Sequence, residues 1–163
     1  YTLYCYKQLG YKQLVSKQKG NYMEQSYHYL SMANQSLFQK QVYSRIHELE
    51  LTPGQPKILE YLAHFNGSIQ KEIARGCQIE KATLTGILDR MEEKDLLERR
   101  CMDGNRREIH VFLTQKGEEK SKAIQQIFMD LEEKIFTDIT ESEKANYLEV
   151  LSKIHRNLRE MEK

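Results

Sequence analysis

The stretch SIQKEIARGCQIEKATLTGILDRMEEK, residues 68–94, decides the fold of this chain. Its apolar residues fall into two short groups at helical spacing, first Ile73 and Cys77, then Leu84 and Ile87, with a brief turn around Gln78-Ile79 between the groups. Two short helices that cross steeply need apolar contacts at such points. The spacing therefore predicts a helix-turn-helix at about residues 68–94.

The residues that follow change to a period of two, which is typical of β-strands. Alternation is visible in residues 97–101 and again in 109–113, and the polar segment 103–107 lies between them. This pattern predicts a β-hairpin, or wing, at about residues 96–113 with a basic tip. A helix-turn-helix followed by such a hairpin is a winged helix-turn-helix domain.

Upstream, residues 24–50 contain no helix breaker and keep a loose helical period. The next helix is predicted to begin with Thr52 as its cap, Pro53 in its first position and Gln55 completing a capping box. Ser68 is the expected cap of the first helix of the helix-turn-helix.

Downstream, residues 115–162 are predicted to form two further helices, the second opened by a capping box from Thr140 to Glu143. A narrow apolar seam spaced like a coiled coil favours a dimer interface over packing within one subunit. The expected fold is mainly α, with long N- and C-terminal dimerisation helices at about 24–50 and 115–162. The seam residues are Tyr147, Leu151, Ile154, Leu158 and Met161.

Composition excludes several classes of protein. Hydrophobic residues make up 39% and charged residues 30% of the 163 residues, and no run approaches the roughly 18 apolar residues of a membrane span. The five histidines lack metal-ligand spacing, and neither a glycine-rich phosphate loop nor a nucleophile elbow is present. The sequence therefore predicts no membrane partner, no enzyme, no metal site and no cofactor.

The three cysteines, Cys5, Cys77 and Cys101, lack paired spacing, which argues for a reducing, cytoplasmic location. Cys77 lies on the apolar face of its helix and is expected to be an inert core residue. Cys101 lies in a wing strand, where oxidation would distort a nucleic-acid contact. Redox control through Cys101 is therefore kept as an alternative.

The first 22 residues differ from the rest of the chain. They contain four lysines and no acidic residue. The rest of the chain then has 21 basic and 24 acidic residues. Because this remainder is slightly acidic, binding to nucleic acid would need positive charge gathered on one face. We expect residues 1–22 to be a disordered tail or to lie outside the natural protein, with Met23 as the natural start and residues 23–163 as the folded domain. A real N-terminal helical arm is the alternative.

The second helix of the helix-turn-helix begins with residue types that suit a major groove. With Leu84 and Ile87 facing inward, Lys81, Thr83 and Thr85 face outward. Short hydroxyl side chains and a lysine at a helix N-terminus can reach base edges or phosphates. Threonines that merely decorate a solvated helix are the alternative, and the helix-turn-helix spacing favours DNA.

Basic residues supply the rest of the predicted interface. Arg106 and Arg107 at the wing tip suit a minor groove, where the potential is most negative. Lys71 and Arg90 are candidate phosphate contacts, although an ion pair with an acidic neighbour, such as Asp89 beside Arg90, competes with that role. The expected DNA-binding residues are Ser68, Gln70, Lys71, Lys81, Ala82, Thr83, Thr85, Arg90, Arg106 and Arg107.

Six stretches between residues 30 and 160 carry a resemblance by their order and spacing: LTPGQ at 51–55, QKEIA at 70–74, LDRMEEK at 88–94, LLER at 96–99, NRR at 105–107 and LTQKG at 113–117. They resemble the bacterial transcriptional regulators of the MarR (multiple antibiotic resistance regulator) family. The resemblance implies a homodimer formed through the first and last two helices, and binding of double-stranded DNA at a pseudo-palindromic operator. It also implies a repressor that a small-molecule effector releases.

Three positions depart from the family pattern. Asn105 replaces an acidic residue before the arginine pair, Gly86 replaces an arginine in the helix, and Asp95 replaces a glycine after the Glu-Lys pair. The resemblance further implies a pocket for an aromatic or anionic effector, for which we expect the residues Tyr43, Arg45, His47, Tyr61 and His64. Besides redox control, a winged-helix module that binds protein in place of DNA is the alternative function.

Overall fold

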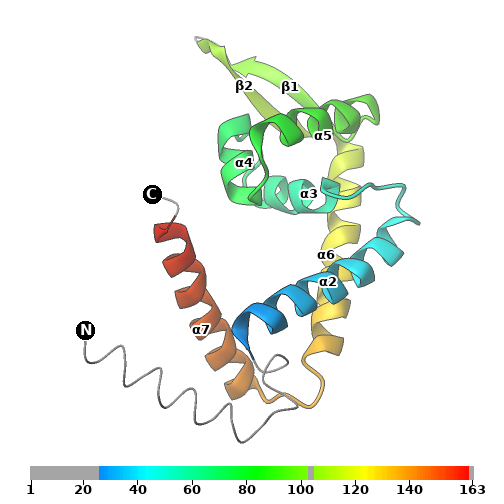
Figure 1. Ribbon diagram of the computed structural model, residues 1–163. Coiled ribbons are helices and arrows are strands. Elements are labelled where there is room, and N and C mark those ends of the chain that lie inside the picture. Colours follow the sequence, from blue (N-terminus) through cyan, green and yellow to red (C-terminus); the bar gives the residue numbers. More distant parts are fainter. Residues whose placement is uncertain (1–25, 103–104, 162–163) are drawn as a thin grey trace, which may run out of the picture. The chain divides into compact units, whose positions relative to one another are not determined.

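The computed structural model describes residues 26–102 and 105–161 (Figure 1). The chain divides into two compact units, residues 1–44 and 45–163. The predictions for residues 1–22 and for Met23 lie outside the described residues. No described helix has the length and apolar character to cross a membrane.

Helix α2, Tyr27–Ile46, supplies the described part of the first unit and ends just inside the second. It carries exposed apolar side chains, including those of Met32 and Leu37. The helix predicted to reach residue 50 ends four residues earlier, because the chain turns at residues 47–50, with Glu50 in the left-handed region at φ 57°.

The second unit contains the predicted winged helix-turn-helix, and its elements follow the expected order (Figure 1). Helices α3, α4 and α5 and the β1–β2 hairpin gather at one end of α6, and α3 packs against both α4 and α6. The bounds are α3 Gln55–His64, α4 Gln70–Cys77, α5 Lys81–Glu93, β1 Leu97–Met102, β2 Asn105–Leu113, α6 Gln115–Ile135 and α7 Glu141–Glu160.

The core of this unit is apolar. Its buried helix residues are largely those that recur at helical spacing in the sequence. Burying one such side chain contributes about 1.5–3 kcal/mol relative to leaving it exposed. All four apolar residues that define the helix-turn-helix spacing are buried. The side chains exposed by less than 2% include Ile58, Leu59, Leu62, Ile73, Leu84, Leu88, Met91, Leu97, Val111 and Ile124.

The predicted start of α3 is wrong by two residues. Gly54, at φ 90°, precedes the helix and Pro56 occupies its first turn, so Thr52 and Pro53 lie in the turn before it. Half of the predicted capping box forms, since the Gln55 side-chain oxygen accepts the Thr52 backbone N–H at 2.8 Å. A side chain at position 54 would contact Ile87 at 2.9 Å, so a glycine suits this turn for space as well as for backbone conformation.

Ser68 does not cap α4, contrary to the prediction. Its hydroxyl donates to the Phe65 carbonyl at 2.8 Å, and the helix begins after Ile69, whose N–H donates to the Glu72 carboxylate. The cause is a non-local contact: the backbone at residues 67–69 pairs with β2, where the N–H of Val111 donates to the carbonyl of Ser68 at 3.0 Å.

The capping box of α7 is as predicted, since Thr140 and Glu143 form it reciprocally. At the start of α6, the Thr114 side chain accepts the Gly117 N–H at 3.1 Å. Asp95 adopts the left-handed conformation, φ 57°, that the family's glycine would adopt. The hairpin pairs Leu97 with Leu113, and its register shifts between Cys101 and Met102.

Replacing Glu60 by glutamine should stabilise the protein at neutral pH. Burial raises the pKa of the Glu60 carboxyl above 4.5, and nearby Glu132 adds to this rise, whereas His64 and Lys57 oppose it. Because the folded state binds this proton more tightly than the unfolded state, stability falls as the pH rises through the raised pKa. The gain in melting temperature should therefore shrink as the pH falls through the raised pKa toward 4.5.

Thermal melts of the wild type and of Glu60→Gln, from neutral pH down to 4.5, test the prediction. Glu133→Gln, at an exposed position on α6, is the control that removes the same charge. A pH-independent difference between wild type and Glu60→Gln would contradict it.

Candidate nucleic-acid interface

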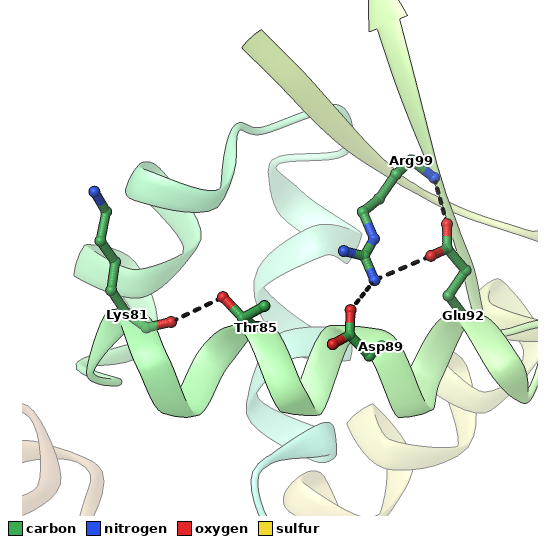
Figure 2. Close-up of polar contacts among 5 residues, drawn as sticks. All are labelled: Lys81, Thr85, Asp89, Glu92 and Arg99. Atoms are coloured by element: carbon green, nitrogen blue, oxygen red, sulfur yellow. Dashed lines mark hydrogen bonds and ion pairs between the residues drawn. The ribbon is translucent and has the colours of Figure 1, made fainter.

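The N-terminal half of α5 presents a polar face to solvent. Leu84 and Ile87 are buried, whereas Lys81, Thr83 and Thr85 are exposed, and Ala82 is exposed between them. The Thr85 hydroxyl donates to the Lys81 carbonyl at 3.1 Å, which fixes the rotamer of this threonine (Figure 2). The structure thus brings the predicted residues of this turn together on one exposed surface.

A tight turn holds α4 against α5. Gln78 ends α4 in the left-handed conformation, and its side-chain amide donates to the Arg75 carbonyl at 2.8 Å. The following N–H, from Ile79, donates to the Ala74 carbonyl at 2.9 Å. Only residues 78–80 separate the helices, so the crossing of α4 and α5 is closely constrained.

The first half of α4 adds positive charge to this surface. Lys71 is exposed, and Ser68 and Gln70, also predicted, are half-buried. Lys71 and Lys81 line one hollow together with Arg75, which the sequence analysis did not include. The signal for Arg75 was present, because it follows Lys71 by four residues and so lies on the same helix face.

Arg99 joins the wing to α5 (Figure 2). Its guanidinium lies 2.5 Å from the Asp89 carboxylate and 3.0 Å from that of Glu92, and its backbone N–H donates to Glu92 at 3.1 Å. Asp89 therefore pairs across to β1, and the ion pair considered between Asp89 and Arg90 does not form. The Arg90 guanidinium instead lies above Gly86, 3.6 Å from where a Cβ of residue 86 would stand.

The wing places further arginines near its tip. Arg106 and Arg107 belong to β2, and their side chains lie outside the described residues. Arg100 on β1 is exposed, contacts Glu98 and stacks above the Phe112 ring at 5.2 Å. The sequence analysis missed Arg100, although the adjacent arginines at 99 and 100 fall on opposite faces of a strand, which predicts that one of them is exposed.

The five residues expected to line an effector pocket belong to both units. Tyr43 is in the first unit, and the other four are in the second. Tyr61 is half-buried with its ring 5.0 Å from that of Phe65, and His64 is exposed, 6.4 Å from the same ring. Arg45 is half-buried and His47 exposed, and the pocket stays a prediction.

The two described cysteines differ in environment. Cys77 is buried, its thiol lies 3.5 Å from the Lys57 carbonyl, and burial raises its pKa to about 11. A thiol that stays protonated is a poor nucleophile, so Cys77 is the inert core residue that the sequence predicts. Cys101 is exposed in β1, opposite Ile109.

Known proteins resemble this chain in sequence and in fold. The model of the MarR family matches residues 51–109. The HTH-type transcriptional regulator PecS of Dickeya dadantii (strain 3937) is 28% identical over 87 residues, which are 53% of this chain and 52% of PecS. The chain spans between about half and two thirds of the length of the curated relatives it matches.

Solved structures agree in fold. The transcriptional regulator PA3341 has a TM-score of 0.76 at 28% identity, covering 83% of this chain and 99% of that one. MepR of Staphylococcus aureus, in its DNA-binding conformation, has a TM-score of 0.74 at 25% identity, covering 82% and 98%. With its helix-turn-helix and wing, the chain contains a winged-helix domain of the MarR type, and residues 51–109 are the part that the family model matches.

Proposed function

We propose that the protein is a transcriptional regulator that binds a specific double-stranded DNA sequence as a homodimer. The observation that carries this proposal is the exposed turn at the N-terminus of α5, where Lys81, Thr83 and Thr85 project from a helix whose other face is buried. The DNA-binding conformation described for MepR, a relative in fold, supports it.

In this proposal α5 enters the major groove. The free N–H groups of its first turn attract a phosphate oxygen, and the threonine and lysine side chains reach base edges. Lys71 and Arg90 contact the backbone, which sets the register without reading sequence. Arg106 and Arg107 at the wing tip enter the adjacent minor groove.

The two long C-terminal helices support the homodimer. No residue of α7 is buried in the described chain, and Tyr147, Leu151 and Leu158 of the predicted seam are all exposed. A 20-residue helix with one apolar stripe gains little stability alone in water. A second copy of the chain covers this stripe and holds two copies of α5 about 34–36 Å apart, one turn of DNA.

Regulation follows from this spacing. A dimer that occupies promoter DNA represses transcription, and a small aromatic or anionic effector releases it by favouring a shape in which the two helices are out of register. Tyr43, Arg45, His47, Tyr61 and His64 are the residues we expect to contact that effector.

Selection of bound fragments from a random DNA library, followed by titration at several salt concentrations, tests the function. A DNA reader should enrich a pseudo-palindromic site and lose affinity with roughly one unit of log–log slope per neutralised phosphate. A protein-binding module would enrich no sequence. Unchanged release by peroxide in a Cys101→Ser variant would remove the redox alternative.

Thr85→Ala should change which sequences are bound more than it changes binding to random DNA. The hydroxyl is exposed in the second turn of α5, where a base edge is within reach, and losing one base contact costs about 1–3 kcal/mol at that position. Binding to a panel of single-base operator variants measures the effect. A uniform loss over the whole panel would instead make Thr85 a phosphate contact.

Arg107→Ala should weaken operator binding while leaving the fold intact. The reason is that Arg107 belongs to the start of β2, next to the wing tip, where its positive charge would enter a DNA groove, while the buried residues of the wing lie further along its strands. Affinity measured at matched salt, with circular dichroism as the control for folding, checks this. Equal affinity of the variant and the wild type would count against the wing as a DNA contact.

A further inference from the structure

The turn between α3 and α4 is hydrogen-bonded to β2 of the wing. The backbone N–H of Gly67 donates to the Val111 carbonyl at 2.9 Å, and the N–H of Val111 donates to the Ser68 carbonyl at 3.0 Å. The Asn66 side-chain oxygen accepts the N–H of Leu113 at 2.9 Å. The turn therefore lies beside β2 like a short extra strand, immediately before the start of α4.

His110 adds a side-chain hydrogen bond to this turn. Its Nδ1 lies 2.6 Å from the carbonyl oxygen of Gly67, and the residue is half-buried. A carbonyl oxygen can only accept a hydrogen bond, so Nδ1 carries the proton and the neutral ring has its lone pair on Nε2. The contact therefore fixes the tautomer of His110 as well as the direction of its ring.

The ring of Phe112 packs against the same turn. Gly67 has φ 84°, and a Cβ there would stand 2.7 Å from a ring carbon of Phe112, so the ring lies directly against the backbone. His110 and Phe112 are two residues apart and share one face of β2, with ring centroids separated by 6.5 Å. Two rings thus hold the turn, and of the two only the His110 ring can donate a hydrogen bond to it.

His110 is well placed to control the outer part of the hairpin. Of the β2 residues that bond the turn, it lies nearest to the wing tip, and the strand continues for about 10 Å to Arg107. The base of the wing is held by buried side chains, among them Leu97 and Val111, whereas Ile109 on the way to the tip is 46% exposed. Losing the His110 bond would free the outer hairpin, which projects beyond α4 and α5 (Figure 1), while the buried contacts at the base remain.

We propose that His110 is a positioning residue for the wing. Its Nδ1–H bond to the Gly67 carbonyl holds the outer hairpin at the angle from which Arg106 and Arg107 reach a DNA groove. His110 itself does not touch DNA, and this role rests on the DNA binding proposed above. Because the turn leads into α4, the same bond keeps the wing at a fixed position relative to the helix-turn-helix.

The position of the ring proton is the first test, and it needs no DNA. NMR of the histidine ring nitrogens in the full chain, at about pH 8 where an imidazole is ordinarily neutral, should show the proton of His110 on Nδ1. The His110→Asn spectrum assigns this signal by its loss. A His110 ring protonated on Nε2 alone would overturn the proposal, because such a ring cannot donate to Gly67.

Variants of His110 provide the second test, in binding to the selected operator. His110→Ala should weaken binding about fivefold, the size of one hydrogen bond. It should also reduce the log–log salt slope by about one unit, because the wing arginines then neutralise fewer phosphates. His110→Asn should bind like the wild type, since its amide N–H can donate from nearly the place of Nδ1, whereas the longer His110→Gln should behave like His110→Ala. A role in packing alone would weaken the Asn and Gln variants alike and would overturn the proposal.

A combined variant shows whether the effect passes through the wing arginines. When Arg106 and Arg107 are both alanine, replacing His110 by alanine should cause no further loss of affinity. His155→Ala, which removes an exposed histidine on α7, should bind like the wild type. Full affinity of His110→Ala, or an undiminished further loss in the combined variant, would overturn the positioning role alone. A wild type that binds no DNA while showing the Nδ1 proton would instead refute the proposed function, and the positioning role with it.

Discussion

Replacing Gly117 by alanine is expected to destabilise the protein by about 3 kcal/mol or more. Gly117 lies in the first turn of α6, and a Cβ there would stand 1.9 Å from the carbonyl oxygen of Leu96 and 3.2 Å from the Leu113 side chain. The obstacle is backbone at the base of the wing, so relief requires α6 to move away from the hairpin and the buried side chains between them to lose contact.

Chemical denaturation of Gly117→Ala measures this loss. Gly86→Ala is the matched control, because a Cβ at position 86 meets only the flexible end of Arg90, at 3.6 Å. In the middle of α5 that change should be neutral or stabilising, by up to about 1 kcal/mol. A Gly117 variant as stable as the wild type would show that α6 does not approach the wing as closely as described.

Arg99→Ala is expected to lower DNA affinity at least about tenfold while the winged domain stays folded. Two carboxylates on α5, Asp89 and Glu92, lose their shared cation and would repel the phosphates of the proposed DNA ligand. The wing also loses its ion pair with α5, so both parts of the proposed DNA-binding surface become less well positioned. The Arg99 side chain is exposed by only 19%, which places it as a bridge between the two elements.

Two controls separate these effects. Lys153→Ala breaks an exposed ion pair with Glu149 on α7 and removes the same charge, so its effect on DNA binding should be small. Arg99→Lys keeps the charge but cannot present the planar guanidinium that reaches both carboxylates, so it should fall between wild type and Arg99→Ala. Full affinity in Arg99→Ala would show that the bridge has no part in binding.

Periodicity predicted the order of the helices and the wing because buried positions recur at fixed intervals within each element. The starts of α3 and α4 were not predictable in the same way. Gly54 has a positive φ just before α3. The backbone of Ser68 pairs with β2, more than forty residues later in the chain, so Ser68 does not cap α4. Local capping rules contain no information about such a contact.

The candidate DNA-binding surface was likewise predictable from the sequence only in part. The exposed face of α5 follows from its own spacing, since burying Leu84 and Ile87 leaves Lys81, Thr83 and Thr85 outside. The partner of Asp89 did not follow, because the adjacent Arg90 is nearer in sequence, whereas Arg99 is brought across by the hairpin. The contact that restricts residue 117 to glycine is likewise visible only once α6 is docked against Leu96.

Helix α7 contributes no buried residue to its own subunit. If a second copy covers it, as proposed, part of the free energy of folding is contributed by association and obeys mass action. The melting temperature should then rise with protein concentration, and subunits carrying different labels should exchange at a rate set by the separation of α7 from its counterpart. Dilution alone would thus become a way to switch the regulator off.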